Sequence, residues 1–285
     1  MDMKRPDWLR IKTVGSRDGS CVTQLLGEQY TVCAEACCPN QYECYSAGTA
    51  TFLLLGPRCT RTCGFCAVGK QLPAPVDLTE PQRVSEIVQR MDLKYCVLTM
   101  VTRDDLDDGG ASHVIDTIEA VREMCPGTVV EVLLSDLNGN WPALERVLNA
   151  KPEVFNHNVE TVPRLYKQVR PQARFERSLE VLHRAASRPG QIVKSGMMVG
   201  LGETTAETVK TIRDIRNTGC HVLTLGQYLQ PSAKHIPVKR YITEEEFNSF
   251  KELSIKIGFT DAACGSFVRS SYKADRLFHK ASTSC

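Results

Sequence analysis

Three cysteines within eight residues are the part of this chain with the clearest chemical potential. Cys59, Cys63 and Cys66 have the spacing C-x3-C-x2-C and follow an apolar, β-rich run over residues 49–55. Thiolates are the preferred protein ligands of iron–sulfur clusters, and close spacing lets one loop supply several of them. Three ligands offered to a four-iron cluster leave one iron open to a molecule other than protein. The alternative is a structural zinc site, which takes four ligands and has no vacancy.

A second set of cysteines lies upstream of the first. Cys33, Cys38 and Cys44 have the spacing C-x4-C-x5-C, which again offers three thiolates to one cluster. Cys37 is a competing ligand, and the spacing does not decide between Cys37 and Cys38. A second set so near the first argues against an isolated zinc site. Two clusters in one chain indicate either an electron relay or a second chemical role.

Composition narrows the classes of protein that this chain resembles. Its 13 cysteines in 285 residues favour metal binding or catalysis in a reducing compartment over a disulfide framework. The net charge of +2 lacks the basic excess of a nucleic-acid binder. No apolar run reaches the ~18 residues that cross a membrane, and the N-terminus lacks the apolar stretch of a signal peptide. We therefore expect a cytoplasmic enzyme with no nucleic-acid or membrane partner.

Alternating strands and helices must position these cysteines. Apolar runs that read as strands are separated by helical patterns, which is typical of parallel βαβ units. The available length suits six units better than eight, because a full eight-stranded barrel needs about 250 residues. We predict an α/β fold, a (β/α)6 partial TIM-type barrel, with its active site at the carboxyl ends of the strands. The expected strands are residues 51–55, 95–100, 128–134, 153–159, 192–200 and 220–228.

Helix signals divide the chain further. Capping boxes are expected at residues 79–82, 204–207 and 243–246, each at the start of a helix. Gly258 is expected to end the last helix, with an irregular tail after it. The predicted division is an N-terminal extension with the upstream cysteines (1–47), the partial barrel (48–242), and a C-terminal helix and tail (243–285).

Three motifs in order resemble one family. An aromatic residue, Phe65, precedes Cys66 and completes the motif C-T-R-x-C-x-F-C, which resembles that of the radical S-adenosylmethionine (SAM) enzymes. Together with the upstream set and the R-S-S-Y-K-A segment at residues 269–274, it resembles the lipoyl synthase family over essentially the whole chain. The resemblance implies two 4Fe-4S clusters and SAM as cofactors. Phe65 would lie near the adenine of SAM.

The resemblance also implies the reaction. The cluster on Cys59, Cys63 and Cys66 would cleave SAM reductively, and two sulfur atoms would be inserted at C6 and C8 of a protein-bound octanoyl chain. The auxiliary cluster on the upstream cysteines would be the sulfur donor. Its further ligand would be Ser270 or Ser271; we favour Ser271 and count it with the catalytic cysteines. The serine is a hard ligand for iron, so this corner would be easily released. The alternative for this segment is an ordinary polar tail.

Candidate contacts to SAM lie at the ends of the expected strands. The segment after residue 100 resembles the family's R-D-D-L-x-D-G-G-A motif, although an acidic surface loop leading into a helix would have the same composition. Acidic side chains and backbone carbonyls there can accept hydrogen bonds from the ammonium of SAM. The candidates are Phe65, Thr102, Arg103, Asp105, Asn158, Glu160, Arg170, Gly200 and Gly202.

Partners follow from the resemblance as well. The substrate would be an octanoylated lipoyl-carrier domain, from 2-oxoacid dehydrogenase E2 subunits or the glycine cleavage H protein. A ferredoxin or flavodoxin would donate electrons, and iron–sulfur assembly proteins would rebuild the auxiliary cluster. The basic segment 234–240 could face an acidic carrier, or be a solvated loop. The competing hypotheses are another radical SAM enzyme and a non-catalytic iron–sulfur or zinc module.

Overall fold

The computed structural model describes residues 6, 9, 26–27, 29–35, 38, 40–46 and 49–282. Cys37, the competing ligand, lies outside these residues. The chain divides into two compact units. In the described chain, the N-terminal unit comprises residues 68–155 and everything from residue 26 to residue 61, and the C-terminal unit comprises residues 62–67 and 156–282 with Pro6 and Leu9.

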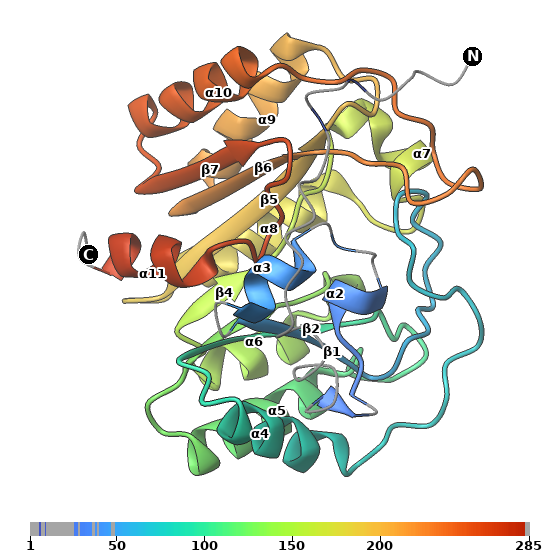
Figure 1. Ribbon diagram of the computed structural model, residues 1–285, viewed down its shortest axis with the longest axis vertical. Helices are drawn as coiled ribbons and strands as arrows, with labels where there is room; N and C mark the ends of the chain where they lie inside the picture. The colour runs from blue at the N-terminus through green and yellow to red at the C-terminus, as the bar shows by residue number, and fades with distance from the viewer. Residues whose placement is uncertain are drawn as a thin grey trace. The chain divides into compact units, whose positions relative to one another are not determined.

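The N-terminal unit is built on buried parallel strands, β1 (Ala50–Leu54), β2 (Tyr95–Met100) and β3 (Val129–Leu133). β2 pairs with both β1 and β3 in parallel. Every residue of β1 and β2 is buried, as expected for strands covered on both faces. The helices α4 (Glu80–Arg90) and α5 (Ala111–Met124) lie side by side (Figure 1), and α6 (Trp141–Asn149) packs on α5.

A short N-terminal segment lies against β1. Thr31 forms an antiparallel bridge with Phe52, and the N–H of Leu53 donates to the carbonyl of Tyr30 at 2.9 Å. Helix α2 (Val32–Glu35) follows this bridge directly, and α3 (Gln41–Ser46) comes next. The edge of β1 is therefore covered by the segment that carries the upstream cysteines.

The C-terminal unit repeats the parallel pattern. β5 (Ile192–Val199) pairs with β6 (Val222–Gln227), and β6 pairs with β7 (Asp261–Gly265). Five α-helices are described in this unit. They are α7 (Tyr166–Val169), α8 (Phe175–Ala186), α9 (Thr205–Asn217), α10 (Glu244–Lys256) and α11 (Ala274–Ser282), and a 3-10 turn η3 (Pro163–Leu165) precedes α7.

The predicted parallel α/β fold is confirmed. The sheet has seven strands in chain order, β1 to β7, with β4 (Val154–Asn156) in the middle. All six expected strands are present. The expected irregular tail after Gly258 is wrong, because β7 and α11 occupy it. β7 is a short Asp-Ala-Ala-Cys-Gly run without branched apolar residues, so its strand character comes from pairing with β6 and not from its own sequence. The three-part division of the chain stays a prediction.

Two of the three predicted capping boxes are confirmed. Thr204 and Thr243 both accept a hydrogen bond from the backbone three residues on, and the glutamate there returns one. The box at Thr79 is wrong, because its hydroxyl donates to Asp77 at 2.7 Å and makes no cap bond. The hydroxyl oxygen accepts instead from Arg83 Nη1 at 3.2 Å, and the Thr79 N–H donates to Asp77 Oδ1 at 2.9 Å, so both halves of the box have other partners.

No helix in the described residues is long and apolar enough to cross a membrane.

The caps give a matched test of stability. Replacing Thr243 by Ala removes a cap bond and should lower the free energy of unfolding by about 1 kcal/mol. Thr79→Ala, at an N-cap without a cap bond, should change it by less than about 0.5 kcal/mol. Urea unfolding followed by circular dichroism measures both, and an equal loss in the two variants would contradict the assignment.

Candidate active site

The first cysteine set lies on a loop that leaves β1 through two left-handed residues. Leu55 has φ 67° and Gly56 has φ 85°. The loop then pairs with its own far end, since Arg58 bridges Gly69 and the N–H of Cys59 donates to the Gly69 carbonyl at 2.8 Å. Cys59 is thus fixed by backbone pairing although no helix or strand carries it.

Thr60 joins this loop to the end of β2. Its N–H and its hydroxyl both donate to the carbonyl of Thr102, at 3.0 and 2.9 Å. The same hydroxyl accepts from the N–H of Asp104 at 3.1 Å. Thr102, a candidate SAM contact, therefore uses its carbonyl to hold the cysteine loop.

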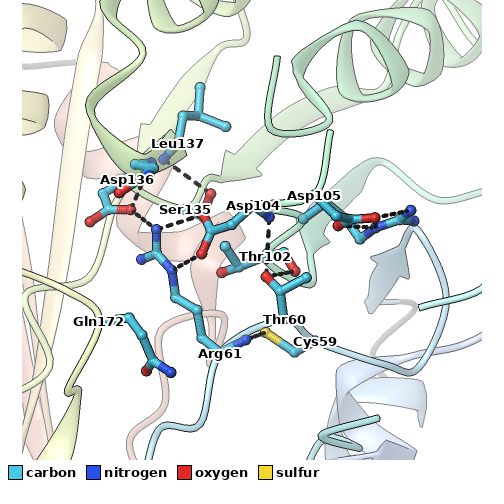
Figure 2. A network of polar contacts seen from close by, with 12 residues as sticks. Cys59, Thr60, Arg61, Thr102, Asp104, Asp105, Ser135, Asp136, Leu137 and Gln172 are labelled. Carbon is cyan, nitrogen blue, oxygen red and sulfur yellow. Dashed lines mark hydrogen bonds and ion pairs between the residues drawn. The ribbon is translucent and has the colours of Figure 1, made fainter. Parts of the chain in front are cut away.

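Arg61 lies between the first and second cysteines and is almost fully buried, at 4% exposure. Figure 2 shows its side chain pointing away from Cys59, between two carboxylates. Nε and Nη2 donate to the two oxygens of Asp104 at 2.8 and 2.9 Å, and Nη2 also lies 2.6 Å from Asp136 Oδ1. Asp136 follows β3 and is buried. The loops that follow β1, β2 and β3 therefore meet at the guanidinium of Arg61.

Charge pairing outweighs burial at Arg61. Burial alone would lower the pKa of Arg61, but hydrogen bonds and charge from Asp104 and Asp136 raise it above its usual range. The guanidinium is therefore permanently charged. The backbone N–H of Arg61 meanwhile donates to Cys59 Sγ at 3.4 Å.

The second half of the loop is held within the C-terminal unit. The amide group of Gln172 accepts from Thr62 N–H at 3.2 Å and donates to its hydroxyl at 2.9 Å. Gly64 donates to the carbonyl of Val169 at 2.9 Å and accepts from the N–H of Ile236 at 3.1 Å. Thr62 and Gly64 thus take their backbone partners from outside this irregular stretch, while the Cys66 N–H donates to the Cys63 carbonyl within it at 3.3 Å.

Two further contacts define this half. His235 Nε2 lies 3.1 Å from the carbonyl oxygen of Cys66, and its Nδ1 lies 2.9 Å from the Ser232 hydroxyl. A Cβ on Gly64 would lie only 2.6 Å from Cδ1 of Ile236. Position 64 therefore requires glycine, because a side chain there would push away the segment that fastens the loop.

The upstream cysteines lie on one compact backbone segment of the N-terminal unit. Cys33 is in α2 and is buried, and Cys44 is in α3. The N–H of Cys38 donates to the Cys33 carbonyl at 3.1 Å, and the Cys44 carbonyl accepts from Thr49 at 2.9 Å. Among the described residues, no three Cys, His, Asp or Glu side chains converge closely enough to hold a metal ion. The cysteines of each set are thus close together along the chain, but their sulfur atoms do not converge on one point.

Arg103 and Asp105 form a tight pair after β2. Arg103 is 3% exposed and grips Asp105 in a bidentate contact at 2.8 Å, which lowers the pKa of the Asp105 carboxyl. Its remaining nitrogen, Nη1, is buried without a hydrogen-bond partner among the described residues. A buried guanidinium N–H with no partner costs free energy, so it is a candidate donor to a ligand.

Asn158 and Glu160 follow β4 in the C-terminal unit. The Asn158 amide donates to Glu160 Oε1 at 3.0 Å, while Asn158 Oδ1 is buried with no partner in the described chain. Burial raises the pKa of Glu160, against the opposing charge of Arg170 and the Asn158 hydrogen bond. Glu160 has φ 70°, a conformation that non-glycine residues rarely adopt outside functional sites.

The other candidates are placed as follows. Arg170 Nη1 donates to the carbonyl oxygens of Asn158 and Val159, at 3.1 and 3.2 Å. Gly200 has φ 101°, and a Cβ there would meet Arg240 O at 2.5 Å, so the chain itself makes the close approach. Gly202, at φ 116°, lies next to the buried Glu203.

The C-terminal serine motif is a tight turn after β7. The N–H of Tyr272 donates to the carbonyl of Arg269 at 3.0 Å, which encloses Ser270 and Ser271 in the turn. Both serines are half-buried. Lys273 then lies over the ring of Tyr272, 4.8 Å from its centroid.

Several supporting residues were missed by the motif reasoning. Asp136, Gln172 and His235 hold the cysteine loop but lie far from it in sequence, within no motif. Asp136 follows an apolar run in a position where strand-end carboxylates are common in parallel sheets, and this signal could have found it. Gln172 and His235 carry no such signal.

Comparison with known proteins is decisive. Residues 53–215 match the radical SAM superfamily. The lipoyl synthase of Chlorobaculum tepidum is 50% identical over 95% of this chain and 95% of its own length. That of Roseiflexus sp. is 51% identical over 95% of this chain and 91% of its own. The chain belongs to the lipoyl synthase family. It is therefore a radical SAM enzyme whose cofactors are SAM and 4Fe-4S clusters, and whose substrate is an octanoylated carrier.

Solved structures agree with the fold. Methylornithine synthase superposes with a TM-score of 0.57 at 15% identity, covering 85% of this chain and 74% of the other. Streptococcus suis SuiB bound to SAM gives 0.55 at 10% identity, covering 83% and 52%. The residues also fit the family's cofactors, since the two thiol sets suit iron–sulfur clusters and Arg103 and Asn158 keep buried polar atoms available for a ligand.

Removing the Arg61 charge tests the buried pair. Arg61→Met leaves Asp104 and the buried Asp136 uncompensated, so the free energy of unfolding should fall by about 3 kcal/mol or more. Lys94→Met is the control, because its pair with Asp92 is exposed and should contribute about 0–1 kcal/mol. Urea unfolding compares the two, and equal losses would show that Arg61 is no more than a surface charge.

Proposed function

We propose that this chain inserts two sulfur atoms at C6 and C8 of an octanoyl chain carried on a lysine of a lipoyl-carrier domain. The observation that carries this is the 50% identity to lipoyl synthases over 95% of the chain. The six cysteines of the two sets and both serines of the motif are among the described residues. Octanoylated carrier domains of 2-oxoacid dehydrogenases and the glycine cleavage H protein are the proposed substrates.

Residues of the first set would hold one cluster. Cys59, Cys63 and Cys66 would supply its three thiolates, and the N–H of Arg61 donates to the sulfur of Cys59. When bound, the clusters supply reductive cleavage of SAM at the first set and sulfide at the second. Phe65, directly before Cys66, would pack against the adenine of SAM. Because its backbone is held by hydrogen bonds, this loop restricts where SAM can lie. Positioning SAM is the chain's contribution to the radical chemistry.

Polar groups at the strand ends would orient SAM. Arg103 Nη1, the buried donor without a partner, would donate to the SAM carboxylate. Asn158 Oδ1, a buried acceptor without a partner, would accept from a ribose hydroxyl, with Glu160 beside it. Thr102 and Asp105 would keep the loop after β2 in place, as their contacts to Thr60 and Arg103 indicate. Arg170, Gly200 and Gly202 would shape the wall.

The second set would hold the auxiliary cluster. Cys33, Cys38 and Cys44 supply three thiolates, and Ser271, or else its neighbour Ser270, supplies an oxygen. An oxygen ligand on iron is harder than a thiolate and would be released more easily as sulfur is lost. A ferredoxin or flavodoxin would donate electrons and iron–sulfur assembly proteins would restore the cluster. A cytoplasmic location is part of this proposal, since 13 cysteines suit a reducing compartment.

Anaerobic reconstitution tests the function directly. The purified chain is loaded with iron and sulfide and incubated with SAM, dithionite and an octanoyl-lysine peptide. Mass spectrometry should show a gain of two sulfur atoms, with loss of two hydrogens once the dithiol closes to the dithiolane. A peptide that stays octanoylated although 5′-deoxyadenosine is formed would point to a different radical SAM reaction.

Substitutions in the two cysteine sets should have different effects on SAM cleavage and on sulfur insertion. Replacing Cys59, Cys63 or Cys66 by Ala should abolish 5′-deoxyadenosine production, because the two remaining thiolates would not hold the cluster that binds SAM. Replacing Cys33, Cys38 or Cys44 by Ala should preserve SAM cleavage but stop sulfur insertion. Chromatography of 5′-deoxyadenosine alongside the peptide assay measures both, and normal lipoyl yield from an upstream variant would refute the donor role. Cys220→Ala, a buried cysteine outside both sets, is the control.

The serine corner can be tested by exchanging oxygen for sulfur. Ser271→Cys should keep the auxiliary cluster while slowing its loss of sulfur, because a thiolate binds iron more firmly than a serine oxygen. Ser270→Cys is the matched neighbour and should behave like the parent if Ser271 is the ligand. Iron released per lipoyl formed is the measurement, and the reverse pattern would assign the ligand to Ser270.

A further inference from the structure

Glu80, the first residue of α4, carries a carboxylate that is only 3% exposed. Its Oε2 accepts from the N–H of Leu55 at 2.8 Å and lies 2.7 Å from His113 Nε2. Its Oε1 accepts from Gln29 Nε2 at 3.0 Å. Gln29 and His113 are each 5% exposed, so the whole group is excluded from water. A buried carboxylate is tolerated only when its oxygens are fully paired, and Glu80 meets this condition with three partners.

Two of the three partners of Glu80, Leu55 and Gln29, lie at the starts of the two cysteine segments. Leu55 is the left-handed residue at which β1 turns into the loop of Cys59. Gln29 opens the segment that pairs along β1 and continues into α2, where Cys33 lies. One side chain therefore holds the start of both segments, from within the N-terminal unit.

The requirements of a helix N-terminus do not explain why Glu80 is buried and bonded to Leu55 and Gln29. A helix start needs only a cap and tolerates an exposed acidic residue in its first turn. Glu80 is instead turned inward to a backbone N–H in a strained conformation and to a side chain 51 residues away in sequence. Strained residues persist when their surroundings overdetermine them, as the contact to Leu55 does here. Arg83, one turn further along α4, adds a second bond to Gln29 Oε1 at 3.2 Å.

We infer that Glu80 is a positioning residue that sets the spacing between Cys59 and the upstream cysteine set, which lie with it in the N-terminal unit. The inference rests on the proposed function, in which both sets bind clusters. A carbon radical formed near one cluster must meet sulfide of the other, so a fixed spacing matters for the second step more than for SAM cleavage. Glu80 acts through Leu55 and Gln29 and touches no reacting atom.

Glu80→Gln tests the link with a minimal change in shape. Whichever way the new amide is oriented, its NH2 group faces one of the two N–H donors, and the other donor loses a charged acceptor. We expect both clusters to bind and SAM cleavage to persist. Hydrogen exchange in the holo protein should become roughly tenfold faster in peptides covering residues 29–35 and 53–59. The spin–spin broadening between the two reduced clusters, seen by electron paramagnetic resonance, should change.

Two further variants separate positioning from general stability. Gln29→Met removes the bond between Glu80 and the upstream segment. Exchange should therefore rise at residues 29–35 and at Leu53, whose N–H donates to the Tyr30 carbonyl, and stay unchanged at residues 55–59. Glu153→Gln is the matched control, a carboxylate of the same unit that accepts from Val130 N–H at 2.8 Å. It should affect exchange around β3 and leave the spectrum unchanged. Glu80→Gln should also raise the ratio of 5′-deoxyadenosine to inserted sulfur above the parent's.

The outcomes that overturn the inference are distinct from failure of the proposed function. An unchanged spin–spin broadening in Glu80→Gln, with both clusters present, would overturn it. So would faster exchange spread evenly over the unit, including residues 129–133, which would mark a general role in folding. A parent protein that holds four irons per chain instead of about eight would refute the two-cluster function itself, whatever the Glu80 variants do.

Discussion

An irregular loop can present cluster ligands only if other parts of the chain satisfy its backbone hydrogen bonds. The loop of Cys59, Cys63 and Cys66 has no helix or strand of its own, and each buried N–H or carbonyl left without a partner would cost free energy. Pairing with Gly69 and Thr102 serves the first half, and Val169 and Ile236 serve the second. The backbone that carries the thiols is therefore held by other segments of the chain, the one after β2 and α7 among them.

Buried charge complements this backbone pairing. Coulombic attraction between Arg61 and two carboxylates is strong in a site from which water is excluded, but each charge pays a desolvation cost. The two effects balance only with good geometry, and the bidentate contact to Asp104 with the 2.6 Å approach to Asp136 provides it. Such a contact specifies one arrangement of the loop, because a shifted loop would leave a charge buried and unpaired. Specificity, more than added stability, is what this pairing contributes.

Much of the fold could be predicted from sequence, because its strands are continuous apolar runs. The limits of β2 agree with the predicted residues 95–100, and Thr204 and Thr243 cap their helices as expected. The predicted box at Thr79 is absent because Arg83 and Asp77 take the hydroxyl oxygen and the backbone N–H that the box would use. Strand β7 was not predicted, because its strand character comes from pairing with β6, which no local sequence pattern reveals. Motifs predicted which residues carry chemistry, but Asp136 and Glu80 depend on contacts across the fold.

The limit of local reasoning has a physical cause that the two buried carboxylate groups share. A motif is a set of residues near one another in sequence, whereas Asp136 and Glu80 act on a loop that precedes them by tens of residues. Their value comes from burial, which makes an unpaired charge costly and so ties distant segments together. The first aligns the loop with the ends of β2 and β3, and the second aligns its start with the upstream cysteines. A reaction that uses first one cysteine set and then the other needs both alignments. The presence of the thiols alone does not fix the distance between the substrate radical and the sulfur that it must reach.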